Sequence, residues 1–108
     1  MTNDDDDVFR ALADASRRQL LDRLHASDGQ SLAELCEGLD MTRQAVAKHL
    51  AILEGANLIA SKRQGREKRH FINPVPINAI AARWIGKFDQ PRLDALAYLK
   101  HRLEGEDQ

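Results

Sequence analysis

The chain has 108 residues, a formal net charge of −1, 43% hydrophobic residues and 31% charged residues. These values are typical of one globular domain and exclude extensive disorder. No apolar run approaches the roughly 18 residues of a membrane span, the acidic residues 4–7 are unlike a signal peptide, and the single Cys36 excludes an internal disulfide. We therefore expect a cytoplasmic protein with no membrane association.

Positive charge is concentrated in the middle of the chain. Residues 42–70 hold seven Lys or Arg and two Glu, a net charge of +5, which leaves −6 for the remainder. A phosphate backbone responds to the local field rather than to the net charge of a protein. The overall charge therefore does not exclude a nucleic-acid partner.

Two helices are predicted near the N-terminus. Residues 1–7 are expected to be a disordered acidic tail. The apolar spacing from Val8 to Ala13 indicates a short first helix, and the negative charge that precedes it suits the helix dipole. Asp14 is the expected N-cap of a second helix that runs to about His25. The residues expected to face inward on the second helix are Leu20, Leu21 and Leu24.

A helix-turn-helix pattern follows. Ser31 and Glu34 are spaced as a capping box that opens a short third helix. After a turn over residues 38–41, an amphipathic helix is expected, capped by Thr42 and ended by Gly55 in a left-handed conformation. Its buried stripe is predicted to be Val46, Leu50 and Leu53. Two short helices joined by a tight turn are typical of DNA-binding proteins.

The outer face of this fourth helix is polar. Set at 100° steps, Arg43, Gln44, Ala47 and Lys48 lie opposite the apolar stripe, with His49 at its edge. Arg and Gln have the forked geometry that matches guanine and adenine edges in a major groove. The small Ala47 allows close approach, so this segment is a candidate recognition helix.

A β-hairpin is predicted next, with strands near residues 58–62 and 69–73 and Gly65 supplying the positive φ of the turn. Its tip is densely basic. A charge run alone is usually a solvated face, but this one directly follows a recognition-like helix. We interpret it as a wing whose cations reach phosphates or the minor groove.

The C-terminal part is helical in pattern. One helix is expected over residues 77–88, and Pro91 is suited to begin a last helix. Together with the first helix these segments carry more apolar surface than the domain needs, so we expect a dimer interface. Its predicted residues are Phe9, Leu12, Trp84, Phe88, Leu93, Leu96, Leu99 and Leu103. We expect residues 8–104 to form a single DNA-binding and dimerisation domain, followed by a disordered tail at 105–108.

Three segments resemble the ArsR-type bacterial repressors. Residues 9–21, FRALADASRRQLL, are similar to that family's ALADPTRRRIL opening, and residues 41–50, MTRQAVAKHL, are similar to its MSQPAVSRHL recognition helix. Residues 54–66 resemble its EAGLV…REGR entry to the wing, and the similarity runs in order from about residue 8 to 75. The resemblance implies a mainly α winged helix-turn-helix with a small β-hairpin, four helices before the hairpin and one or two after it. It also implies a homodimer whose terminal helices pair.

The resemblance also implies a DNA-binding surface. By position, the expected contacts on the recognition helix are Thr42, Arg43, Gln44, Ala47 and Lys48, with His49 at the backbone. On the wing, the resemblance implies contacts with phosphate or minor groove from Arg63, Arg66 and Lys68, and Lys62 in the same basic segment is a further expected phosphate contact.

The family's metal-binding motifs are incomplete in this chain. Members that sense metals on the third helix carry ELCVCDL, but Gly38 stands where the second thiolate belongs, and Cys36 is the only thiol. His101 and Glu104 match half of the other family site, whose Asp-x-His half is missing. We expect no metal and no cofactor, and we interpret Cys36 as a small buried hydrophobic residue rather than a redox switch.

The sequence therefore predicts a sequence-specific DNA-binding transcriptional regulator, a dimeric repressor that occludes a promoter at an inverted-repeat operator in double-stranded DNA without sensing metal. Two alternatives are a ligand- or metal-gated sensor of the same family and a winged-helix protein-interaction module that does not read DNA. An enzyme is not expected, because the sequence contains no nucleophile elbow, phosphate-binding glycine loop or paired carboxylates in a structured segment.

Overall fold

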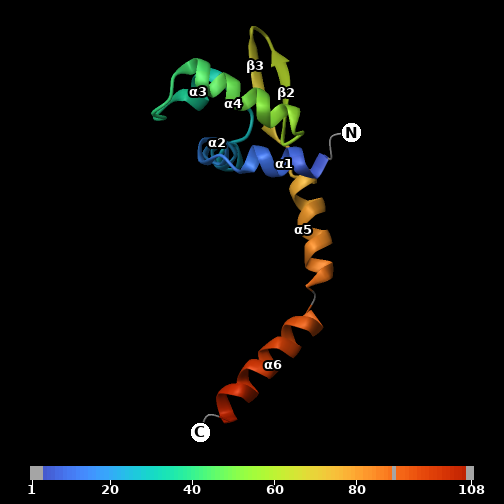
Figure 1. Cartoon of the computed structure of the whole chain (residues 1–108). Coiled ribbons are helices and arrows are strands. Elements are labelled where there is room, and N and C mark those ends of the chain that lie inside the picture. The colour runs from blue at the N-terminus through green and yellow to red at the C-terminus, as the bar shows by residue number, and fades with distance from the viewer. Residues whose placement is uncertain (1–3, 89, 107–108) are drawn as a thin grey trace. The chain divides into compact units, whose positions relative to one another are not determined.

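A computed structural model describes residues 4–88 and 90–106 of the chain (Figure 1). The chain falls into two compact units, Met1–Ile77 and Asn78–Gln108, which are described separately below. The predicted fold class is confirmed: the described residues are mainly helical, with one small antiparallel sheet. Whether residues 8–104 act as a single domain stays a prediction.

The first unit begins with α1 (Asp4–Leu12) and α2 (Ala15–Ala26). α1 starts at Asp4, so residues 4–7 are helical rather than a disordered tail, and residues 1–3 of that expected tail lie outside the described residues. Carboxylates in a first turn stabilise a helix through its dipole, which accounts for the earlier start. Asp14 is the N-cap of α2 as predicted, since its Oδ1 accepts from the backbone amides of Ser16 at 2.8 Å and Arg17 at 3.2 Å. The Arg17 hydrogen bond is the main reason that the pKa of Asp14 is lowered.

The helix-turn-helix consists of α3 (Leu32–Cys36) and α4 (Arg43–Gly55). The predicted capping box is confirmed: Ser31 Oγ accepts from the Glu34 amide at 3.3 Å, and Glu34 Oε1 accepts from the Ser31 amide at 3.4 Å. Thr42 caps α4 by accepting from the Ala45 amide at 3.1 Å. Both helix starts are thus encoded by local side chains.

The predicted end of α4 is wrong in one respect. Gly55 lies within the helix, and the residue with a left-handed backbone is Asn57, with φ +63°. The Leu58 amide donates to the Leu53 carbonyl at 2.9 Å and the Asn57 amide donates to the Glu54 carbonyl at 3.0 Å, which is a Schellman motif. Leu53 and Leu58 are both fully buried. Burial of Leu58 therefore places the turn two residues later than glycine preference alone suggests.

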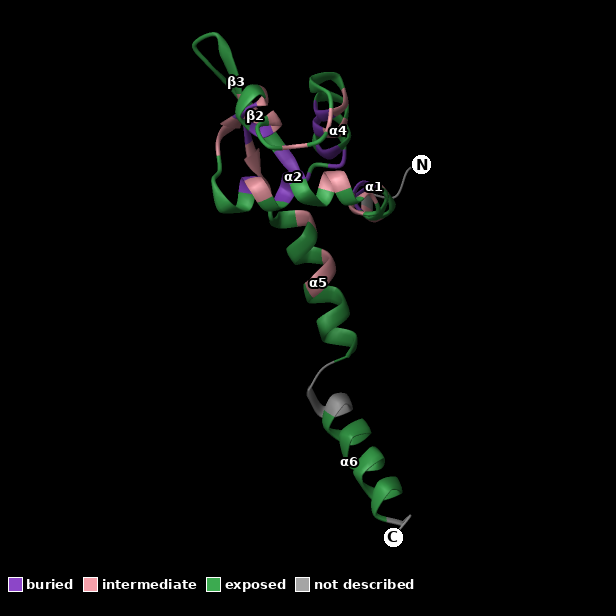
Figure 2. Cartoon of the chain, turned by 90° about the vertical axis from the view of Figure 1, so that its left-hand side faces the viewer, coloured by how far each residue is buried: buried purple, intermediate pink, exposed green. Residues whose placement is uncertain are grey.

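The sheet has the strand order β1-β3-β2, all antiparallel. β2 (Ile59–Gln64) and β3 (Glu67–Ile72) form the predicted hairpin, and Gly65 has the expected positive φ of 64° at the first position of the two-residue turn. β1 (Gln30–Ser31) was not predicted; its two residues pair with His70 and Arg69. Figure 2 shows that the hairpin tip is exposed, whereas its base joins the buried interior.

The core of this unit lies where α1, α2, α3 and α4 meet the base of the hairpin. The largest fully buried side chains are Leu20, Leu24, Leu35, Val46, Leu53, Leu58 and Ile59. This set includes two of the three leucines predicted to face inward on α2 and two of the three stripe residues predicted for α4; the remaining two, Leu21 and Leu50, are also buried, at 6% and 4% exposure. The hydrophobic periodicity of these helices is thus confirmed as burial.

The second unit contains most of α5 (Val75–Lys87) and α6 (Gln90–Glu106). α6 continues to Glu106, so the expected disordered tail is helical over residues 105–106, and residues 107–108 lie outside the described part. Trp84 and Phe88 stack with ring centroids 6.0 Å apart, and Lys87 Nζ lies 4.8 Å from the centroid of the Trp84 ring. Among the described residues, no helix combines the length and the hydropathy needed to cross a membrane.

Candidate nucleic-acid interface

The exposed face of α4 carries the predicted recognition residues. Arg43, Gln44, Ala47 and Lys48 are all exposed, whereas Val46, Leu50 and Leu53 on the other side are at most 4% exposed. The helix is therefore fixed to the core by one stripe and presents a guanidinium, an amide and an ammonium group outward. These are the groups that suit base edges and phosphates.

A groove of about 330 Å³ separates α4 from the wing. Arg43 and Ala47 line it from α4, and Arg66 and Lys68 line it from the hairpin. Figure 1 shows the hairpin of β2 and β3 rising beside α4. Of the predicted cations, one from the helix and two from the wing thus border the same surface feature, whereas Lys48, Lys62 and Arg63 lie outside its lining.

The cations of this face differ in how they are paired. Lys68 Nζ lies 3.5 Å from Glu54 Oε2, which partly neutralises its charge. Ser61 Oγ donates to Glu54 Oε1 at 2.6 Å, and this hydrogen bond, followed by the nearby Lys68, lowers the pKa of Glu54. In the described part of the chain, neither the Arg43 side chain nor the Arg66 side chain takes part in an ion pair or hydrogen bond. These two arginines are therefore the most available cations of the groove.

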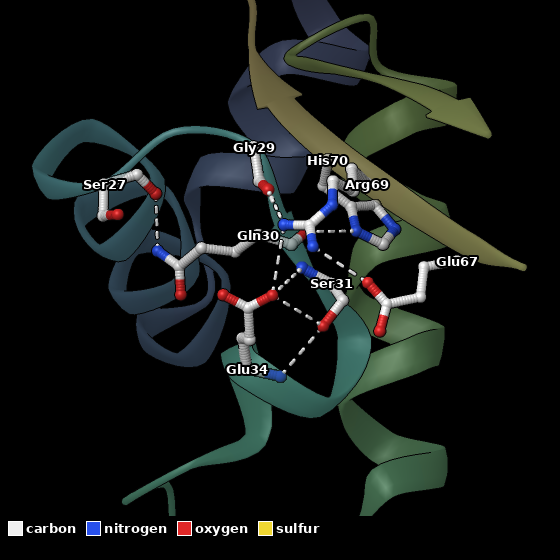
Figure 3. A network of polar contacts seen from close by, with 8 residues as sticks. All are labelled: Ser27, Gly29, Gln30, Ser31, Glu34, Glu67, Arg69 and His70. Carbon is white, nitrogen blue, oxygen red and sulfur yellow. Dashed lines mark hydrogen bonds and ion pairs between the residues drawn. The ribbon is translucent and has the colours of Figure 1, made fainter. Parts of the chain in front are cut away.

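The side chain of Arg69 connects elements of the fold. Its Nη1 donates to the Gly29 carbonyl at 2.9 Å and to Glu34 Oε1 at 3.2 Å, and its Nη2 donates to Glu67 Oε2 at 2.9 Å (Figure 3). Next to it, His70 is only 5% exposed, with Nδ1 3.0 Å from the Gln30 carbonyl oxygen. This network ties β3 to β1 and to the start of α3. It fixes the wing relative to the helix-turn-helix.

His49 is half-buried and is held by Arg17, a residue that the sequence interpretation did not single out. Arg17 Nη1 lies 3.3 Å from His49 Nδ1. A guanidinium group has no acceptor, so Nδ1 must accept, and the proton of the neutral ring is on Nε2. This leaves His49 as an N–H donor at the edge of the recognition helix, which suits the backbone contact predicted for it.

The same arginine anchors α4 to the end of α1. Arg17 Nε donates to the Ala11 carbonyl at 2.8 Å, and Arg17 Nη2 donates to the Arg10 carbonyl at 3.0 Å. The sequence contains one signal for this role: Arg17 lies in the first turn of α2, where a cation is unfavourable to the helix dipole unless another contact offsets it. Without coordinates, that partner could not be identified.

The region of the family's metal site departs from a thiolate cluster. Cys36 is half-buried rather than fully buried as expected. Gly38 has φ +74°, and a Cβ built there would lie 3.2 Å from Arg23 Nη2, so a cysteine at this position would be strained. His101 and Glu104 are exposed on α6. Within the described ranges, no three His, Cys, Asp or Glu side chains are grouped so as to hold a metal ion.

The side chains predicted for the dimer interface are mostly exposed in the single chain. Phe9 is 49% exposed and Leu12 is half-buried. On α5 and α6, the exposed large hydrophobic residues include Trp84, Phe88, Leu96, Leu99 and Leu103. The side chain of Leu93 lies outside those that the structure describes. The dimer interface itself stays a prediction.

Comparison with known proteins agrees with this geometry. A family described as a helix-turn-helix domain matches residues 12–62. YuzN, an uncharacterized HTH-type transcriptional regulator of Bacillus subtilis (strain 168), is 38% identical over 91 residues, 79% of this chain and 99% of YuzN. The transcriptional repressor SdpR of the same organism is 32% identical over 59 residues, 55% of this chain and 64% of SdpR.

Among solved structures, an ArsR-like transcriptional regulator from Rhodococcus sp. RHA1 is similar in fold. It superposes with a TM-score of 0.70 and 33% sequence identity, and the match covers 91% of each chain. The similarity therefore extends beyond the helix-turn-helix itself.

Proposed function

This chain belongs to the ArsR-type winged helix-turn-helix transcriptional regulators, and from that membership we propose that it is a dimeric repressor of an inverted-repeat operator. Repression follows from occlusion of the promoter. Two-fold symmetry places the two recognition helices in successive major grooves, with half-sites roughly 10 base pairs apart from centre to centre.

The observation that carries the proposal is the shared groove between α4 and the wing. Arg43 on the recognition helix and Arg66 at the hairpin tip both line it. A single approach of the duplex therefore brings base edges to one arginine and the sugar-phosphate backbone to the other. Arg43, together with Gln44 and Lys48, is assigned to base reading, and Arg66 with the other wing cations to phosphate or minor-groove contacts.

The test begins with selection of bound sequences from a pool of random duplexes, followed by affinity measurements on the selected site and on random DNA. Arg43→Ala is expected to lose about 1–3 kcal/mol of binding free energy on the selected site and to relax preference at one base pair. Arg66→Ala is expected to weaken both DNAs alike and to reduce the salt slope by about 1. Lys100→Ala on α6 is the matched control for lost charge.

Selection of an inverted repeat supports the proposal. The absence of any enriched sequence, together with weak and equal binding of all duplexes, would instead favour a winged-helix module that contacts protein. Equal loss on both DNAs for Arg43→Ala would show that Arg43 touches only phosphate.

Dimerisation through the terminal helices is the second component of the proposal. It is supported by the exposed apolar side chains of α5 and α6, such as Trp84 at 48% and Leu99 at 51%, since monomeric proteins rarely leave such patches open. Leu99→Glu is expected to convert the protein to a monomer in sedimentation velocity and to abolish tight operator binding. His101→Glu, at an exposed position about 200° around the same helix from Leu99, is the matched control and should leave the assembly unchanged. A wild-type protein that sediments as a monomer would refute this component.

Metal-independent action is the third component. It is supported by the backbone at Gly38, where a second thiolate would be strained. Titration of zinc, cadmium or arsenite into the protein–operator complex should leave the complex intact. Release at one metal ion per subunit would establish the metal-gated alternative.

A further inference from the structure

The groove between α4 and β3 has the size and lining of a small-molecule site. Its volume of about 330 Å³ is within the range of ligand pockets, roughly 300–1,000 Å³. Its apolar lining residues are Leu32, Ala33, Ala47, Leu50 and Ala51. All of its lining lies in the first unit, between residues 31 and 70.

The charges around the groove leave an unbalanced positive potential. Both carboxylates that line it are occupied: Glu54 accepts from Ser61 and pairs with Lys68 at 3.5 Å, and Glu67 pairs with Arg69 at 2.9 Å. As described above, Arg43 and Arg66 have no such partner within the described ranges. Because one arginine comes from the helix and the other from the wing, an anion in the groove is contacted from both sides.

We propose that this groove binds a small organic anion with an apolar body, and that the bound anion excludes DNA. A carboxylate accepts charge-assisted hydrogen bonds from Arg43 and Arg66, and the body packs on the apolar lining. The exclusion of DNA rests on the proposed function, because the two arginines that hold the anion are those assigned to DNA. A DNA phosphate supplies the same negative charge but has no apolar body. A preference for an anion with an apolar body over a simple anion therefore distinguishes a small-molecule site from a site that holds only phosphate.

The direct test is an NMR titration of the ¹⁵N-labelled full chain with 2-naphthoate, which combines a carboxylate with an apolar body. Saturable shifts are expected at the amides of Ala47, Ala51 and Arg66. The neutral analogue 2-naphthamide lacks the charge, and the anion acetate lacks the apolar body. Each should therefore bind at least about tenfold more weakly than 2-naphthoate. Equal binding of the amide, no saturable binding, or shifts confined to residues 78–106 would overturn the proposal.

Variants separate the groove from general charge. Ala51→Leu adds volume to the groove lining from an exposed position of α4 and keeps both arginines, and leucine is a good helix former. It is expected to reduce naphthoate affinity at least about tenfold, as steric filling of a pocket does. Arg66→Gln should also weaken binding. Arg63→Gln, on the same wing but outside the groove lining, is the matched control and should leave naphthoate affinity unchanged. Loss of binding in Arg63→Gln to the same extent would overturn the assignment.

Competition is measured with a fluorescent duplex at constant ionic strength. With naphthoate at ten times its dissociation constant, the apparent Kd for DNA should rise about 11-fold, and acetate at the same concentration should have no such effect. An unchanged Kd in the presence of groove-bound naphthoate would overturn the exclusion of DNA. If no duplex is bound even without naphthoate, the proposed function fails, while the NMR titration still decides whether the groove is an anion site.

Discussion

Removal of Arg69 should reveal how much the contacts of Figure 3 stabilise the wing. The guanidinium contacts three acceptors: the Gly29 carbonyl at 2.9 Å, Glu34 at 3.2 Å and Glu67 at 2.9 Å. A charge-assisted hydrogen bond to a part-buried carbonyl contributes about 1.5 kcal/mol. The two carboxylates are about half exposed, so each pair contributes only about 0.2–1 kcal/mol. Holding the arginine side chain in one conformation costs rotamer entropy, which offsets part of this sum by up to about 1 kcal/mol.

The net expectation for Arg69→Ala is a loss of about 1.5 kcal/mol in the free energy of unfolding, of which the contact with Gly29 is the largest part. The assay is urea denaturation at one fixed protein concentration, because the proposed dimerisation would make apparent stability concentration-dependent. Arg63→Ala on the neighbouring strand is the matched control, since it removes the same charge from an exposed position, and it should change stability by less than about 0.5 kcal/mol. A loss for Arg69→Ala no larger than that of the control would refute the reasoning.

Three further predictions concern backbone and charge. Asn57→Ala should destabilise by about 1 kcal/mol because alanine resists a left-handed backbone, whereas Asn57→Gly should be neutral within about 0.5 kcal/mol; a thermal or urea midpoint distinguishes them. Gly38→Ala should lower stability by about 1 kcal/mol or more. Gly86→Ala, in the last turn of α5 and without a positive φ, should instead raise it slightly, by less than about 0.5–1 kcal/mol, and equal effects of the two would show that φ at Gly38 carries no strain. The folded-state pKa values of Glu54 and Asp14 lie below their ordinary values of 4.5 and 3.8, so their stabilisation is complete above those values and is lost as the pH falls through the lowered ones. Urea midpoints measured from pH 6 to pH 2 should therefore decrease as the pH falls below those values, and Glu54→Gln should make this decrease smaller. An identical pH profile for the variant would contradict the role of Glu54.

Local sequence signals predicted the helix-turn-helix because they act within a few residues. Asp14, Ser31 and Thr42 each cap a helix through amides two or three positions away, and these caps are present as predicted. The apolar periodicity of α2 and α4 became burial of the expected leucines. Gly65 marked the hairpin turn for the same local reason.

Local reasoning failed where a distant residue decides the outcome. The end of α4 was misplaced because burial of Leu58 selects Asn57 rather than Gly55 for the left-handed position. The two-residue β1 exists only through its pairing with β3, so no pattern within residues 30–31 could have predicted it. Helix formation over residues 4–7 was missed because an aspartate run has low helix propensity.

The amino-acid sequence alone determined the helix-turn-helix, the exposed polar face of α4 and the basic hairpin, because hydrophobic period, capping and charge are properties of neighbouring residues, and the resemblance of three segments indicated the family. Only the tertiary structure decided which cations are available: Lys68 is paired with Glu54, Arg69 joins strands and helix, and Arg17 holds His49. It also brought Arg43 and Arg66 to one groove. The physical reason is that ion pairs and grooves depend on distances of a few ångströms between segments far apart in the chain, and such distances are set only when the whole core packs.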